Sequence, residues 1–105
     1  MHKIALLLTA FRAVSPSMTI QGAHTFLLVA MNEGKSLIEI ANLSGFKYPT
    51  VSRNILDLGE RNRKRQPGLG LVITVNDPNE MRKKQVRLTD KGRTLLNQLT
   101  NIMKV

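Results

Sequence analysis

Apolar side chains recur along this chain at alternating steps of three and four residues, the spacing of a helix that is buried along one face. Near the amino terminus, Ile4, Leu7, Leu8 and Phe11 follow this spacing. The same pattern returns four more times, so the sequence predicts five helices. They span residues 2–13, 20–31, 37–43, 47–60 and 90–103.

Residues that begin or end helices stand at the boundaries of these segments. Thr19 and Thr89 can each cap the helix that follows, and Ser36 with Glu39 has the Ser-x-x-Glu spacing of a capping box. Gly45 can end the third helix in the left-handed conformation. The side chains of the third helix that are predicted to face the core are Leu37, Ile40, Ala41 and, as a further candidate, Leu43.

Two short segments after the fourth helix have the composition of strands. Residues 71–75 are rich in β-branched side chains, and residues 85–88 alternate between polar and apolar. Turn-forming residues at 76–79 separate them. The predicted fold class is therefore mainly α with a small β-hairpin (α+β), a winged helix-turn-helix with a wing of two or three strands. Residues 1–105 are expected to form a single domain.

The third and fourth helices have the spacing of a helix-turn-helix motif. Ala41 is small enough to let two helices cross, Gly45 can make the turn, and Val51 can fill the space between the helices. Gly45 and Val51 follow Ala41 by four and ten residues, as in the motif that reads duplex DNA. The alternative is an ordinary helical hairpin with a polar outer face.

If Val51, Ile55 and Leu58 are buried, the polar side chains near the start of the fourth helix lie at or near its free face. A helix-turn-helix motif presents this half of the helix to the major groove. Arg53 has the two-pronged geometry that matches a guanine edge. The candidate DNA-contacting residues of this helix are Lys47, Tyr48, Thr50, Ser52, Arg53 and Asn54.

The turn between the predicted strands leads into three basic residues, Arg82, Lys83 and Lys84. A basic hairpin after a helix-turn-helix pair is typical of a wing, which places positive side chains on phosphates or in the minor groove. Asp77 or Glu80 can pair with Arg82 and orient it. The alternative is a solvated hairpin tip, but the order of helix pair and hairpin along the chain favours the wing.

Positive charge is concentrated in one third of the chain. The net charge is +9, and residues 61–93 hold ten Lys or Arg against three Asp or Glu. Such a one-sided block indicates a surface that binds a polyanion. Within it, the segment before the first strand supplies additional candidate phosphate contacts, with a solvated loop as the alternative. These candidates are Arg61, Arg63, Lys64 and Arg65.

Composition excludes several other kinds of site. The chain has no Cys, which excludes disulfides and thiolate metal sites, and two isolated His do not form a metal site. Four aromatic residues are too few for a platform that stacks single-stranded bases. The sequence contains no glycine-rich phosphate loop, no catalytic triad pattern and no apolar run that could cross a membrane. We therefore expect a cytoplasmic protein of a prokaryote that is not an enzyme and uses no metal or cofactor.

Residues 36–93 resemble the core of a MarR-type winged-helix transcriptional regulator. The matching segments are SLIEIANLSG, PTVSRNILDL, GLV and DPNEMRKKQVRLTDKGR. The last is the most specific, because it joins an acidic-Pro-x-acidic-x-Arg turn to a Val-x-Leu-Thr-x-x-Gly-Arg ending. The terminal helices resemble the family only loosely.

This resemblance implies a homodimer that binds a pseudo-palindromic operator and represses transcription. It implies major-groove contacts by Tyr48, Thr50, Ser52 and Arg53, and a minor-groove contact by Arg82. It also implies that the terminal helices, 2–13 and 90–103, form the dimer interface. The side chains expected in that interface are Ile4, Leu7, Leu8, Phe11, Leu95, Leu99, Ile102 and Met103.

The sequence departs from the family pattern in three places. Lys47 stands where the family often has a small capping hydroxyl residue, and extra residues separate Leu58 from the GLV strand. Both ends are also shorter than usual. That shortness argues against the small-molecule effector pocket that many members form between their dimer and DNA-binding parts, and it weakens the expectation of a dimer.

The leading hypothesis is a sequence-specific regulator of transcription that binds double-stranded DNA, a repressor that occupies promoter DNA as a homodimer. Two alternatives stay open. One is an architectural or replication-associated winged-helix protein with little sequence preference, and the other is a protein-interaction module whose basic face meets an acidic partner. Sequence preference and salt dependence of binding distinguish the three.

Overall fold

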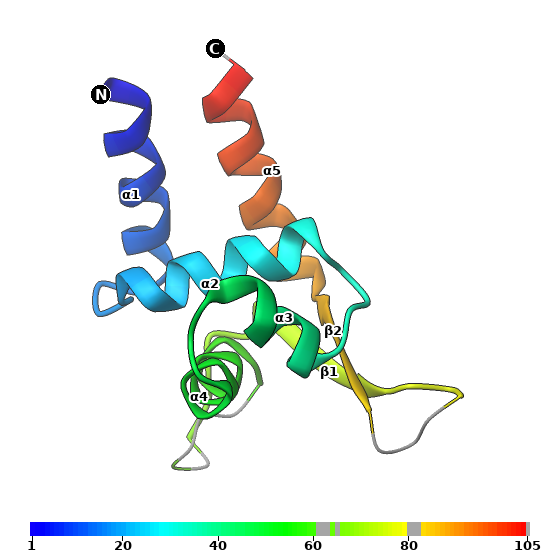
Figure 1. The fold of residues 1–105 in the computed structure, drawn as a ribbon. Helices are drawn as coiled ribbons and strands as arrows, with labels where there is room; N and C mark the ends of the chain where they lie inside the picture. The colour runs from blue at the N-terminus through cyan, green and yellow to red at the C-terminus, as the bar shows by residue number, and fades with distance from the viewer. Residues whose placement is uncertain (61–63, 65, 80–82, 105) are drawn as a thin grey trace.

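The computed structural model describes residues 1–60, 64, 66–79 and 83–104. Within these residues it has five helices and one two-stranded sheet, in the order that the sequence predicts (Figure 1). They are α1 (His2–Val14), α2 (Ile20–Met31), α3 (Leu37–Ser44), α4 (Tyr48–Leu58), β1 (Val72–Asn76), β2 (Lys84–Leu88) and α5 (Asp90–Lys104).

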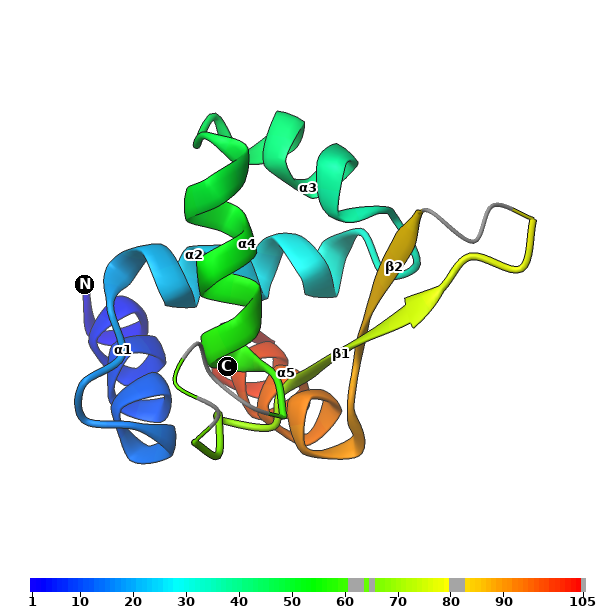
Figure 2. The same cartoon turned by 90° about the horizontal axis from the view of Figure 1, so that it is seen from below.

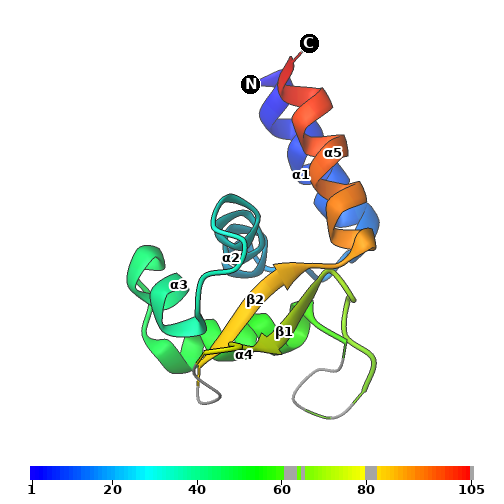
Figure 3. The same cartoon turned by 90° about the vertical axis from the view of Figure 1, so that its right-hand side faces the viewer.

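The elements form two groups. Helices α2, α3 and α4 lie together with the hairpin β1–β2, and we call this group the winged body (Figures 1 and 3). Helices α1 and α5 pack side by side and project from it, and we call this pair the arm. In the described part of the chain, no helix is both long and apolar enough to cross a membrane.

The helices begin where capping side chains predict. The hydroxyls of Thr19 and Thr89 each accept a hydrogen bond from the backbone N–H three residues later, at 2.9 and 3.0 Å. Ser36 and Glu39 form both hydrogen bonds of the capping box. Helix α4 differs, because its cap residue Lys47 makes no side-chain capping bond and a proline occupies the first turn instead. The departure from the family pattern at Lys47 therefore changes how α4 is capped.

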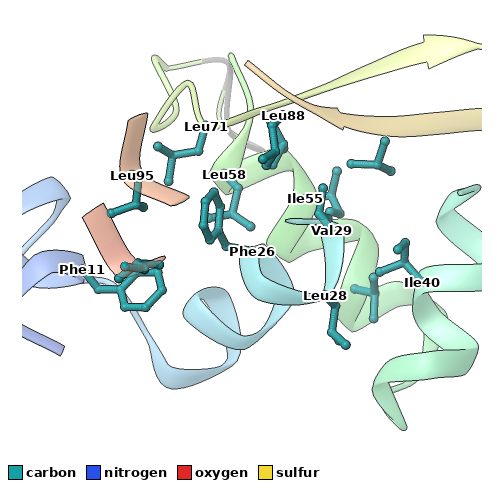
Figure 4. Packing of buried hydrophobic residues seen from close by; sticks show 14 of the residues in the cluster. Phe11, Phe26, Leu28, Val29, Ile40, Ile55, Leu58, Leu71, Leu88 and Leu95 are labelled. Carbon is teal, nitrogen blue, oxygen red and sulfur yellow. The ribbon is translucent and has the colours of Figure 1, made fainter. Parts of the chain in front are cut away.

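The hydrophobic core lies between α2, α4, the hairpin and the base of α5 (Figure 4). Phe26 and Val29 of α2 are fully buried at its centre, and Ile55 and Leu58 of α4 pack there. Phe11 of α1 meets Phe26 edge to face, with ring centroids 6.0 Å apart and planes at 81°. The core therefore extends from the winged body into the base of the arm.

The wing is an antiparallel ladder of five residue pairs that starts with Val72 opposite Leu88. The structure has two of the two or three strands predicted, and an isolated bridge between Ser36 and Gln85 lies beside them. Because Ser36 is also the cap of α3, this bridge fixes the start of the helix-turn-helix pair against β2.

The prediction that Leu43 faces the core is wrong. Helix α3 buries Ile40 and Ala41, whereas Leu43 is 53% exposed. At 3.6 residues per turn, Leu43 points roughly 120° away from Leu37 around the helix axis. It therefore lies outside the stripe that α3 presents to α2 and α4.

One carboxylate joins the arm to the winged body. Both oxygens of Glu33, which follows α2, accept hydrogen bonds from Nη2 of Arg93 in α5, each 2.9 Å long. The Oε2 atom also accepts a hydrogen bond from the backbone N–H of Leu88, at 3.2 Å. Burial alone would raise the pKa of Glu33, but the bonds from Arg93 and Leu88 and the charges of Arg93 and Arg87 outweigh it and lower the pKa below 4.5.

Replacing Glu33 by glutamine is expected to lower the free energy of unfolding by about 1 kcal/mol at neutral pH, because a charge-assisted pair at a partly exposed site is lost. A carboxylate whose pKa is lowered by folding stabilises the protein above its unfolded pKa, and this contribution is lost as the pH falls through the folded pKa. The difference between wild type and variant should therefore shrink below about pH 4.5.

Urea denaturation at a series of pH values measures this difference. Glu60→Gln, which neutralises an exposed carboxylate at the end of α4, is the matched control. A difference for Glu33→Gln that stays the same from neutral to acidic pH would contradict the role assigned to its charge.

Candidate nucleic-acid interface

Helices α3 and α4 form the close pair that the sequence predicts. Ala41 and Val51 are buried where the helices meet. Between them Gly45 has a φ of +76°, a left-handed conformation that glycine adopts without steric cost. The Ser44 hydroxyl donates to the carbonyl of Ala41 at 2.8 Å and accepts from the N–H of Phe46 at 2.9 Å. These bonds fix the turn of the helix-turn-helix motif.

Helix α4 buries the predicted side chains, Val51, Ile55 and Leu58. The opposite side of its amino-terminal half is open to solvent, and in Figure 2 the helix runs along the surface beside the hairpin. Five of the six candidate contacts of this segment are exposed or half-buried on or next to that side. They are Lys47, Tyr48, Thr50, Ser52 and Arg53.

The sixth candidate, Asn54, is half-buried, and its side chain is turned toward α2 instead of the free face. Its Nδ2 atom donates a hydrogen bond to the hydroxyl of Thr25, 3.2 Å away, and Thr25 is fully buried in α2. Asn54 is three residues after Val51 and one before Ile55, so it flanks the buried stripe of α4. Its side chain therefore ties α4 to α2.

Basic side chains flank α4 as far as the described residues extend: two line a depression with its exposed amino-terminal half, and one lines a depression with its carboxyl-terminal half. Lys83 and Lys84 are exposed on the wing, and Lys64 is exposed in the segment that precedes β1. The remaining basic candidates lie outside the described residues and stay predictions from the sequence, as does an ion pair of Arg82 with Asp77 or Glu80. These candidates are Arg61, Arg63, Arg65 and Arg82.

Asp77 holds the beginning of the wing turn. Its Oδ1 atom accepts a hydrogen bond from the N–H of Asn79 at 2.8 Å, and its Oδ2 atom accepts one from Nε2 of Gln85 at 3.5 Å. The acidic residue of the wing motif therefore shapes the turn that the turn-forming residues at 76–79 predict.

The segment before β1 is attached to the carboxyl end of α4. The backbone N–H groups of residues 69–71 donate to the carbonyl oxygens of residues 57–59, at 2.8–3.1 Å. The extra residues that distinguish this chain from the family pattern therefore return to α4 before the first strand begins.

The expected dimer interface divides into two sets of side chains. Phe11, Leu95 and Leu99 are buried within the chain, because α1 and α5 pack against each other. These three side chains were expected in the interface, but they are not accessible to a partner subunit. Leu7 and Ile102 are half-buried. The members that are exposed on the arm are Ile4, Leu8 and Met103.

Sequence reasoning missed a group of exposed apolar side chains beside α4. Ile38 of α3, Leu56 of α4 and Ile73 of β1 are each between 44% and 55% exposed. For Leu56 the sequence did indicate exposure, because this apolar residue lies off the buried stripe of its own helix. For Ile73 no signal was available, since an apolar residue in a strand is usually assigned to a core.

No model of a known protein family and no curated protein matches the sequence. Solved structures do match. A mutant of MepR from S. aureus bound to an oligodeoxyribonucleotide is 22% identical with a TM-score of 0.74, covering 98% of this chain and 69% of that one. The transcriptional repressor CouR, bound to a 23-mer DNA duplex, is 25% identical with a TM-score of 0.68, covering 94% and 63%.

A MarR transcriptional regulator from Methanosarcina mazei is 16% identical with a TM-score of 0.72, covering 93% of this chain and 63% of that one. The chain thus spans about two thirds of the length of these structures. Together with the wing motif and the helix pair, these similarities show that the protein has the winged-helix fold of MarR-type transcriptional regulators.

Proposed function

We propose that this protein is a sequence-specific regulator of transcription that binds double-stranded DNA and represses by occupying promoter DNA. One observation carries the proposal. Tyr48 and Ser52 of the exposed half of α4 line the same surface depression as Lys83 and Lys84 of the wing. A helix that fits the major groove and a basic hairpin that fits the flanking backbone or minor groove therefore face one side of the molecule.

The similar structures support this proposal, because two of them are described as bound to DNA. We further propose that the protein acts as a homodimer through its arm, where exposed Ile4 and Leu8 lie one helical turn apart and Met103 is exposed on α5. A dimer would present two copies of α4 to successive turns of one face of the duplex.

Selection of bound sites from a random duplex library, followed by affinity measurement in a salt series, tests the proposal. We expect an inverted repeat with half-sites about one helical turn apart. The selected site should bind roughly 10³-fold or more tightly than random duplex, and both affinities should fall steeply with salt. Equal affinity for all duplexes would assign the protein to an architectural role instead. Absence of duplex binding at low salt would favour a protein partner for the basic face.

Replacing Arg53 by alanine is expected to weaken binding to the selected site by about 1–3 kcal/mol and to relax the base preference at one position, if its guanidinium binds a guanine edge. Arg12→Ala is the matched control, because it removes one positive charge from the exposed surface of the arm. Repeating the site selection with both variants measures the change. An unchanged base preference for Arg53→Ala would show that its contact is with phosphate.

A further inference from the structure

Helix α4 crosses α2 within the winged body, and the rotation of α4 about its own axis decides where its exposed side chains point (Figure 2). The buried stripe of Val51, Ile55 and Leu58 holds α4 against the core, but apolar contacts are not directional. At the start of α4, Lys47 makes no side-chain capping bond. A directional contact in the middle of the helix therefore sets its rotation more closely than the stripe alone.

One hydrogen bond between side chains supplies such a contact. The Nδ2 atom of Asn54 donates to the Oγ1 atom of Thr25 in α2, 3.2 Å away. Thr25 has no exposed surface, and Asn54 is the only hydrogen-bond partner of its hydroxyl among the described residues. A buried hydroxyl that loses its partner is costly, so the structure favours the rotation of α4 that keeps the bond.

Asn54 is close in sequence to the residues proposed to read DNA, but it lies on another side of α4. It lines a depression with Gly22 of α2, whereas Tyr48 and Ser52 line the depression that contains the wing lysines. Arg53 precedes Asn54 directly and points roughly 100° away around the axis. A rotation of α4 by about 10° moves an atom about 5–6 Å from that axis by about 1 Å, which is enough to break a hydrogen bond to a base edge.

We propose that Thr25 and Asn54 are positioning residues for base recognition, because their hydrogen bond fixes the rotation of α4 and thereby the direction of Thr50 and Arg53. The proposal rests on the proposed function and adds to it a residue, Thr25, that is too deeply buried to touch DNA. Two competing interpretations are a bond that only stabilises the fold and an Asn54 side chain that contacts DNA directly.

Thr25→Val tests the proposal, because it removes the hydroxyl, keeps the size of the side chain and alters no exposed atom. We expect the affinity for the selected site to fall roughly tenfold, the usual effect of one lost base contact. Affinity for random duplex should change by less than about twofold, and its salt dependence should stay the same, since no phosphate contact is removed. Repeating the site selection should show a weaker base preference at the positions that α4 reads.

Two further variants separate positioning from stability. Thr25→Ser keeps the hydroxyl but loses a buried methyl group, so it should be less stable than wild type and still keep the base preference. Thr94→Val is the matched control on α5, where an exposed hydroxyl donates to the carbonyl of Asp90 at 3.0 Å, and it should bind like wild type. Circular dichroism and the thermal midpoint confirm that each variant is folded at the temperature of the DNA measurement.

A double-mutant cycle tests whether the two residues act through their shared bond. Asn54→Leu should weaken the base preference as Thr25→Val does. The double variant should then lose little more than either single variant, because both substitutions remove the same interaction.

Three results would overturn the positioning role and leave the proposed function intact. A wild-type base preference in Thr25→Val would show that the bond does not set the direction of α4, and its loss in Asn54→Leu alone would assign that side chain to a direct DNA contact. An equal loss in Thr25→Ser and Thr25→Val would assign the bond to stability only. Absence of duplex binding by the wild type would remove both proposals.

Discussion

Replacing Gly92 by alanine is expected to lower the free energy of unfolding by about 3 kcal/mol or more, because the new methyl group overlaps a backbone that cannot move independently. Gly92 lies in the first turn of α5, and a Cβ atom there would collide with the carbonyl oxygen of Leu71. The same carbonyl accepts a hydrogen bond from the N–H of Thr89 at 3.0 Å. To admit the methyl group, α5 must shift away from the start of the wing.

The chain contains a matched control for this substitution. Thr19 and Gly22 stand at the start of α2 as Thr89 and Gly92 stand at the start of α5, with the same hydroxyl-to-N–H cap. At Gly22 the nearest atom to a new Cβ is the Thr19 hydroxyl at 3.2 Å, and no backbone of another segment is in contact. Gly22→Ala should therefore change stability by less than about 1 kcal/mol. Urea denaturation of both variants measures the difference, and equal stabilities would contradict the close packing of α5 on Leu71.

Replacing Phe26 by alanine is expected to lower the free energy of unfolding by about 3–5 kcal/mol, since it removes a large side chain from the centre of the core. Phe26 has no exposed surface, and it connects the winged body to the arm through its edge-to-face contact with Phe11. A loss of this size is a large share of the roughly 5–15 kcal/mol that stabilises a typical domain. The variant is therefore expected to be partly unfolded at moderate temperature.

Phe26→Leu keeps an apolar side chain at this position and should cost less than about 1.5 kcal/mol. Denaturant and thermal unfolding of both variants, monitored by circular dichroism, give the comparison. Because Phe26 is fully buried and is not part of the exposed face of α4, the folded fraction of each variant should keep the DNA affinity of the wild type. A loss below 1 kcal/mol for Phe26→Ala would contradict a core that is shared by arm and body.

The sequence predicted the elements of this fold because their boundaries are set by interactions within a few residues. The Ser36–Glu39 capping box, the threonine caps at Thr19 and Thr89 and the left-handed turn at Gly45 each act locally, and each is present in the structure. The helix-turn-helix pair followed from the same kind of signal, together with the spacing of small and apolar residues. The wing followed from turn residues and alternation.

Periodicity did not correctly assign side chains near the edge of a buried stripe to the core or to the surface. Periodicity placed Leu43 inside and Asn54 at or near the free face. In the structure Leu43 is exposed and Asn54 is half-buried against α2, because the neighbouring helix decides which flank of a stripe is covered. The terminal helices show the same limit. Their apolar residues were assigned as one set to a partner subunit, but Phe11 and Leu95 are covered by the chain itself.

The sequence by itself therefore determined the order of the elements, their ends and the class of fold, since caps, turns and periodicity operate over one or two turns of chain. Only the tertiary structure decided how the arm is joined to the body through Glu33 and Arg93, which are 60 residues apart. It also decided that Leu56 and Ile73 line a groove beside the wing. Contacts of this kind depend on how separate elements meet in space, and no local pattern encodes that meeting.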